Sequence, residues 1–107
     1  MSISVHVREY DGPTVESYLG PGVRQLVELS YGVSDRFPLL SGVDTDDETV
    51  FNERQCKRLR DELRDLAEEA DDEAVRSAAY SLIELTRLVM GSEGNVPGHR
   101  TLYFNGG

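Results

Sequence analysis

The longest regular pattern of apolar positions runs from residue 52 to residue 70, where apolar residues recur every three or four positions. At about 100° per residue, this spacing places them on one stripe of a helix. Asn52 followed by Gln55 is typical of a capping box, in which two side chains bind backbone amides of the first turn. The pattern therefore predicts a helix that begins after Asn52. Its apolar stripe consists of Cys56, Leu59, Leu63, Leu66, Ala67 and Ala70.

The opposite face of this predicted helix carries charges of opposite sign four residues apart. Arg58 precedes Glu62, and Arg64 precedes Glu68, at this spacing. Such pairs stabilise a helix by roughly 0.2–0.5 kcal/mol each. We therefore expect these charged residues to form a solvated face.

A second and wider helical pattern extends to Met90. Three carboxylates, Asp71, Asp72 and Glu73, stand at its start, where the positive end of the helix dipole favours them. Gly91 is expected to end the helix and to open a loop. Because the connection to the first helix is short, we expect an antiparallel helical hairpin. The apolar face consists of Val75, Ala78, Ala79, Leu82, Ile83, Leu85, Thr86, Val89 and Met90.

The two ends of the sequence predict short strands. Residues 2–7 alternate, with Ile3, Val5 and Val7 on one face, which is the period of a half-buried strand. Residues 101–104 indicate a second strand. We expect these N- and C-terminal strands to pair in a small antiparallel sheet that packs on the helical hairpin. The predicted fold class is therefore α+β, in a single domain of residues 1–107.

The segments between these elements are less regular. Residues 14–19 predict no definite structure, whereas residues 23–31 fit about two turns of amphipathic helix after a Gly-Pro-Gly interruption. The apolar run from Phe37 to Leu40 contains Pro38. We expect it to be an extended packed segment or an edge strand, because proline cannot donate a hydrogen bond within a central strand.

The charge of the chain narrows the class of partner. Twenty Asp and Glu against 11 Lys and Arg give a formal net charge of −9. This charge repels phosphate backbones and anionic lipids, so we expect a basic protein partner and neither nucleic acid nor a membrane. No run approaches the roughly 20 apolar residues of a membrane-spanning helix, and no signal segment is recognisable. We expect a cytoplasmic protein.

The densest acidic cluster consists of Asp44, Asp46, Asp47 and Glu48. A calcium-binding loop that begins at Asp44 would need a glycine at its sixth position and a glutamate at its twelfth, where Thr49 and Gln55 stand. We therefore expect no metal here, and interpret the cluster as a contact patch for a basic protein or as a solvated loop. Asp44 and Asn52 are both suited to capping nearby backbone groups.

The sequence contains no recognisable catalytic or cofactor motif. His6 and His99 lie near the two strands expected to pair, but without a positioned carboxylate they are a weak pattern for zinc or for acid–base catalysis. Cys56 is expected to be a buried small hydrophobe. The Gly-Pro-Gly segment lacks the lysine and hydroxyl residue of a phosphate-binding loop. We therefore expect a non-enzymatic protein without cofactors.

Two residues of the second helix depart from its apolar face. Tyr80 falls on the polar side, where an exposed tyrosine is a common interface anchor, although it can equally cover the edge of its own core. Leu88 also lies off the apolar face. A second contact surface built on Tyr80 and Leu88 would suit a homodimer.

One sequence pattern resembles a known group of proteins. The order Phe37-Pro-Leu-Leu, Asp44 and Thr49-Val-Phe-Asn52, followed by a charged helix, resembles a small uncharacterised bacterial protein family of the actinobacterial type. This resemblance covers most of the chain and implies no activity. The size, acidity and α+β make-up are also similar to those of toxin immunity proteins, a likeness in size and charge alone.

Three functions are compatible with these observations. The first is an immunity or antitoxin-like inhibitor that binds a basic effector through the acidic cluster at residues 44–48. The second is a structural or scaffolding subunit of a bacterial assembly, with homodimers formed through Tyr80 and Leu88. The third is a small ligand-binding protein or enzyme. Its pocket would be built from His6, His99, Asp44, Thr49 and Asn52.

Overall fold

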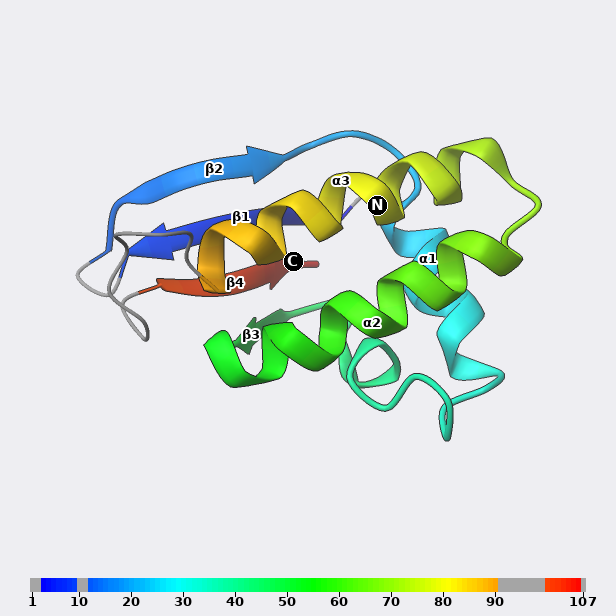
Figure 1. Ribbon diagram of the computed structural model, residues 1–107. Coiled ribbons are helices and arrows are strands. Elements are labelled where there is room, and N and C mark those ends of the chain that lie inside the picture. Colours follow the sequence, from blue (N-terminus) through cyan, green and yellow to red (C-terminus); the bar gives the residue numbers. More distant parts are fainter. Residues whose placement is uncertain (1–2, 10–11, 91–99, 107) are drawn as a thin grey trace.

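The computed structural model describes residues 3–9, 12–90 and 100–106. It has two layers, with helices α2 and α3 in front of the sheet and α1 beyond the strand ends at the right of Figure 1. In chain order the elements are β1 (Ser4–Glu9), β2 (Thr14–Tyr18), α1 (Val23–Tyr31), a 3-10 helix η1 (Leu40–Gly42), β3 (Glu48–Phe51), α2 (Glu53–Glu69), α3 (Glu73–Met90) and β4 (Arg100–Asn105).

The sheet has the strand order β2-β1-β4-β3, and all neighbouring strands are antiparallel. Strand β1 pairs with β4, with Val5 opposite Phe104 and Val7 opposite Leu102. These four side chains are fully buried beneath the helices. The predicted pairing of the N- and C-terminal strands and the α+β class are thus confirmed.

Helices α2 and α3 lie side by side and run in opposite directions (Figure 1). The capping box at the start of α2 is present: the Asn52 side chain accepts the Gln55 amide at 2.9 Å, and the Gln55 side chain accepts the Asn52 amide at 2.9 Å. At the start of α3, the Asp72 carboxylate accepts the amide of Ala74 at 2.8 Å. Local capping therefore sets where both helices begin. Gly91 and the loop expected after it lie outside the described residues.

The core lies between the sheet and the helices. The apolar stripe predicted for α2 is buried, and so is that of α3 except for the partly exposed Met90. Cys56 is fully buried, as expected. Gly22 brings α1 close to α3, because a Cβ atom at this position would lie 2.4 Å from the carbonyl oxygen of Ala74. Its φ of +98° is also a conformation that favours glycine.

The structure adds two strands in the irregular segments and corrects one prediction. Residues 14–18, for which no definite structure was predicted, form edge strand β2, and residues 48–51 form edge strand β3, which begins at Glu48 of the acidic cluster. The expectation of an extended or edge-strand segment at Phe37–Leu40 was wrong. There the chain makes a turn that leads into η1, with the Ser41 amide bound to the Phe37 carbonyl at 2.9 Å. Phe37 and Leu40 are nevertheless buried, as expected for a packed segment.

The solvated face predicted for α2 also needs correction at Glu62. This residue is 4% exposed, although Arg58 lies 3.7 Å from its carboxylate and is largely exposed. The carboxylate points to the turn before η1 and accepts backbone amides there. A contact between distant segments, not pairing along the helix, therefore determines its environment.

Candidate functional site

The acidic loop, defined here as residues 44–48, is shaped by its own side chains. The Asp44 carboxylate accepts the Asp46 amide at 2.8 Å, and the Asp47 carboxylate accepts the Glu48 amide at 2.8 Å. The hydroxyl of Thr49 accepts the amide of Asp44 at 2.9 Å. Asp44 thus caps the loop backbone, as its residue type favours.

The C-terminal end of the chain fixes this loop from its other side. The Gly106 amide donates to the Asp47 carbonyl at 3.0 Å. A Cβ atom at Gly106 would lie 2.3 Å from the carbonyl oxygen of Thr45, so a side chain has no room there. The acidic loop is therefore held in one shape by contacts on two sides.

The carboxylates of the acidic loop differ from those of α2 in their pairing. On α2, Glu53 lies 3.9 Å from Lys57, and Asp61 lies 3.9 Å from Arg64. Within residues 3–9, 12–90 and 100–106, no salt bridge involves a carboxylate of the acidic loop. The loop is thus a cluster of negative charge that no side chain in the described ranges neutralises.

Glu48 connects the acidic loop to the open face of the sheet, which no described helix covers. Its carboxylate accepts the Tyr103 hydroxyl at 2.7 Å. This hydrogen bond, followed by burial and the charge of Glu48, raises the pKa of Tyr103. The guanidinium of Arg8 lies 5.0 Å from the centre of the Tyr103 ring. Val50, half exposed on β3, extends the same face next to Tyr103.

His6 lies on this open face beside Tyr103, with 5.7 Å between the ring centres. Its Nδ1 is 2.7 Å from the Ser17 hydroxyl, and its Nε2 is 2.9 Å from the Ser4 hydroxyl. Burial, and then the charge of Arg8, lower the pKa of His6. A neutral imidazole suits this position, because it can donate to one hydroxyl and accept from the other.

The pocket considered around the two histidines is not assembled among the described residues. The Thr49 side chain is engaged by the acidic loop, and that of Asn52 caps α2. His99 lies outside the described residues. No group of three or more His, Cys, Asp or Glu in the described ranges is placed to hold a metal ion.

The structure separates the two members of the surface predicted on α3. Tyr80 is 50% exposed and lines a shallow groove along the outer side of the helix. Leu88, in contrast, is partly buried against the core, so it contributes less to a contact surface than expected. The groove is lined by Glu73, Arg76, Ser77, Tyr80, Ser81 and Glu84.

Sequence reasoning missed an apolar groove between α1 and the end of α2. Leu29, on the helix expected at residues 23–31, is exposed and lines this groove with Val33. No local pattern shows that two helices distant in the sequence leave such a gap. The groove therefore forms only when the chain folds, and the sequence alone does not predict it.

No helix in the described part of the chain has the length and apolar character needed to cross a bilayer. Comparison of the chain with protein-family models, with curated proteins and with solved structures finds no match.

Proposed function

We propose that this protein is a non-enzymatic protein-binding module, an inhibitor of the immunity or antitoxin type that binds a basic effector protein in the cytoplasm. The observation that carries the proposal is the acidic loop. The carboxylates of Asp44, Asp47 and Glu48 each accept a hydrogen bond, and no carboxylate of the loop has a salt-bridge partner among the described residues.

A preformed acidic loop suits this role for two physical reasons. Complementary charge accelerates association and selects the partner by its sign. A loop already held by Thr49 and Gly106 loses little conformational freedom on binding, so less of the interaction energy is spent on ordering it. Val50 offers apolar contact area beside the charges.

The proposal is tested by recovering partners of the purified protein from a lysate of its own organism and identifying them by mass spectrometry. We expect one basic protein at equal stoichiometry. The association rate of this protein is then measured with the wild type and with a variant in which four acidic residues become lysine. These residues are Asp44, Asp46, Asp47 and Glu48.

We expect the association rate to fall at least about tenfold in this variant and to fall with added salt in the wild type. A control with half of this charge change replaces Glu16 and Asp61, which are exposed and lie outside the loop, with lysine. Equal rates for the loop variant and the wild type would overturn the electrostatic role of the loop. Recovery of no basic protein would overturn the proposed function itself.

A second candidate is a structural subunit that forms homodimers through α3. The exposed ring of Tyr80 in its shallow groove favours it, since tyrosine is enriched at interface centres. Sedimentation at rising concentration tests it. Dimers that are lost in Tyr80→Ala would support this candidate, and a wild type that stays monomeric would reject it.

A further inference from the structure

The groove between α1 and α2 combines a buried apolar floor with exposed apolar rims. Leu29 is 53% exposed and Val33 38% exposed, whereas Phe37, Leu66 and Ala70 beneath them are buried. The groove holds about 180 Å³, less than the roughly 300–1,000 Å³ typical of small-molecule pockets. Its size suits one or two apolar side chains of another protein.

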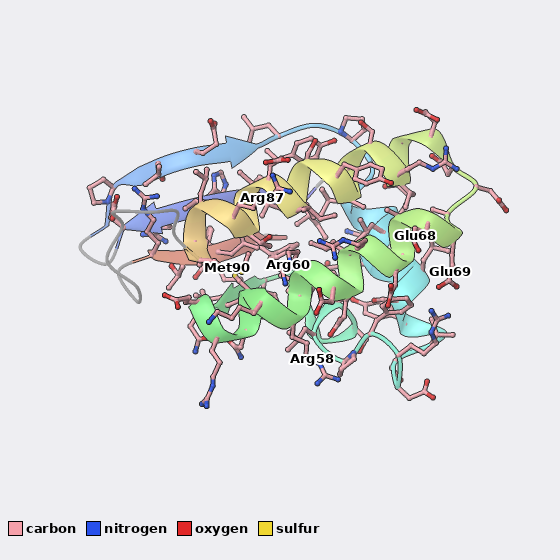
Figure 2. The ribbon with its side chains drawn as sticks, in the orientation of Figure 1. Arg58, Arg60, Glu68, Glu69, Arg87 and Met90 are labelled. Carbon is pink, nitrogen blue, oxygen red and sulfur yellow. The ribbon has the colours of Figure 1, made fainter. Side chains whose placement is uncertain are left out.

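The end of the helical hairpin beside this groove is strongly acidic. Residues 65–73 contain six carboxylates and no Lys or Arg. Figure 2 shows two of them, Glu68 and Glu69, at the end of α2, and Glu69 lines the groove itself. The six are Asp65, Glu68, Glu69, Asp71, Asp72 and Glu73.

Among the described residues, Arg36 and Arg76 form salt bridges with carboxylates of this end. Arg36 binds both carboxylate oxygens of Glu69, one of them at 2.9 Å, and this hydrogen bond raises the pKa of Arg36. The charges of Asp65 and then Asp35 raise it further. Arg76 donates to the Ala70 carbonyl at 2.7 Å and lies 3.5 Å from the Glu73 carboxylate. The other four carboxylates of this end have no salt bridge with a described residue.

We propose that this groove docks an amphipathic helix of a basic protein, with apolar side chains between Leu29 and Val33 and Lys or Arg beside Asp65 and Asp35, whose charges reach Arg36 at the groove. The inference rests on the proposed function, because it names the surface and the chemistry of that partner. A helix with apolar residues every three or four positions and basic residues around them matches an apolar groove with an acidic rim.

Charge selects this occupant over a second copy of the chain. Two copies would bring two net charges of −9 together, with the acidic rims facing each other. Like charges in contact are costly at an interface. An acidic or neutral helix would fill the groove but leave the rim unpaired, so the complementary partner is basic.

The test uses a synthetic peptide of about 18 residues, with Leu at helical spacing and Lys elsewhere, and a second peptide with Glu in place of Lys. Binding is measured by fluorescence anisotropy, and the surface is mapped by amide chemical shifts of the labelled protein. We expect the Lys peptide to bind and to shift residues around Leu29 and Val33. The Glu peptide should not bind.

Matched variants locate the binding surface. Replacing both Leu29 and Val33 with Gln should weaken Lys-peptide binding at least about tenfold, because both rims lose apolar area. Leu19→Gln changes another exposed leucine, 72% exposed and outside the groove, and should bind as the wild type does. Circular dichroism checks that each variant is folded.

Charge variants separate this inference from the proposed function. Asp65→Asn with Asp35→Asn should weaken peptide binding severalfold, whereas Asp46→Asn in the acidic loop should not. If only Asp46→Asn weakens peptide binding, or if the variant with Leu29→Gln and Val33→Gln still binds the peptide, the groove is not the docking site. The proposed function would still stand. Equal binding of the two peptides overturns the charge argument. If the wild type self-associates and the variant with Leu29→Gln and Val33→Gln does not, the groove binds a second copy of the chain and not a basic partner.

Discussion

The carboxylate of Glu62 on α2 accepts a hydrogen bond from the backbone amide of Leu40, with 3.0 Å between Oε1 and the nitrogen. The same carboxylate accepts the Leu39 amide, at 3.1 and 3.2 Å from its two oxygens. Glu62 lies more than 20 positions after Leu39 and Leu40 in the sequence. One buried carboxylate therefore fixes the turn that leads into η1.

Removing this carboxylate should destabilise the protein. Glu62→Ala is expected to lower the free energy of unfolding by about 2–4 kcal/mol, because two amides lose their acceptor. Glu62→Gln keeps one neutral acceptor and should cost roughly 1–2 kcal/mol. Urea denaturation measures both. Glu68→Ala, at an exposed position, is the control and should change the free energy of unfolding by no more than about 0.5 kcal/mol. If Glu62→Ala changes it as little as Glu68→Ala does, the Glu62 carboxylate does not stabilise the turn.

A side chain at Gly22 should loosen the contact between α1 and α3. Gly22→Ala is expected to cost at least about 2 kcal/mol, because its φ of +98° is strained for alanine and the new Cβ meets the Ala74 carbonyl. Gly42→Ala is the matched control, since nothing lies within 4 Å of a Cβ atom there. Thermal unfolding of the two variants makes the comparison. Equal midpoints would show that the close approach at Gly22 is unimportant.

The thiol of Cys56 should be unreactive in the folded protein. Burial, and then the charge of Glu53, raise the pKa of Cys56 to about 12, so almost no thiolate exists at neutral pH. We expect no reaction with a disulfide reagent such as dithionitrobenzoate until urea unfolds the chain. Fast reaction without denaturant would place Cys56 outside the core.

Acid should weaken the fold through His6. The pKa of His6 is lowered from an ordinary value of 6.5, so the unfolded chain binds a proton more readily than the folded one. The contribution of neutral His6 to the free energy of unfolding is therefore fully present above pH 6.5 and is lost as the pH falls below this value. Urea denaturation from pH 7.5 to 5 should show a steeper decline for the wild type than for His6→Gln. His99 is present in both proteins, so parallel curves would contradict the lowered pKa.

The elements predicted correctly are those whose signals are local. The capping box at Asn52 and Gln55 and the alternation at Ile3, Val5 and Val7 depend on neighbours within a few residues. The edge strands gave no such signal, because β2 is short and exposed on both faces, so its side chains do not alternate between apolar and polar. Their place in the sheet depends on partners elsewhere in the chain.

The candidate surfaces also differ in whether a local sequence pattern predicts them. Composition alone identifies the acidic residues at positions 44–48 as a charged cluster, but not that Glu48 begins strand β3, which separates the cluster from α2. The sequence pattern assigned Glu62 to solvent because Arg58 stands one turn earlier, whereas a segment more than 20 residues away buries it. The groove at Leu29 depends on how α1 meets α2, which no local pattern contains.

The pairing of β1 with β4 determines how long strand edges stay unpaired while the protein is being synthesised. Glu9 lies opposite Arg100, which is 91 residues later. When a ribosome has made everything up to α3, β1 has only β2 as a neighbour, and β3 has none. The nascent chain therefore exposes unpaired strand edges until its last strand emerges, which is the stage at which chaperones protect such chains from aggregation.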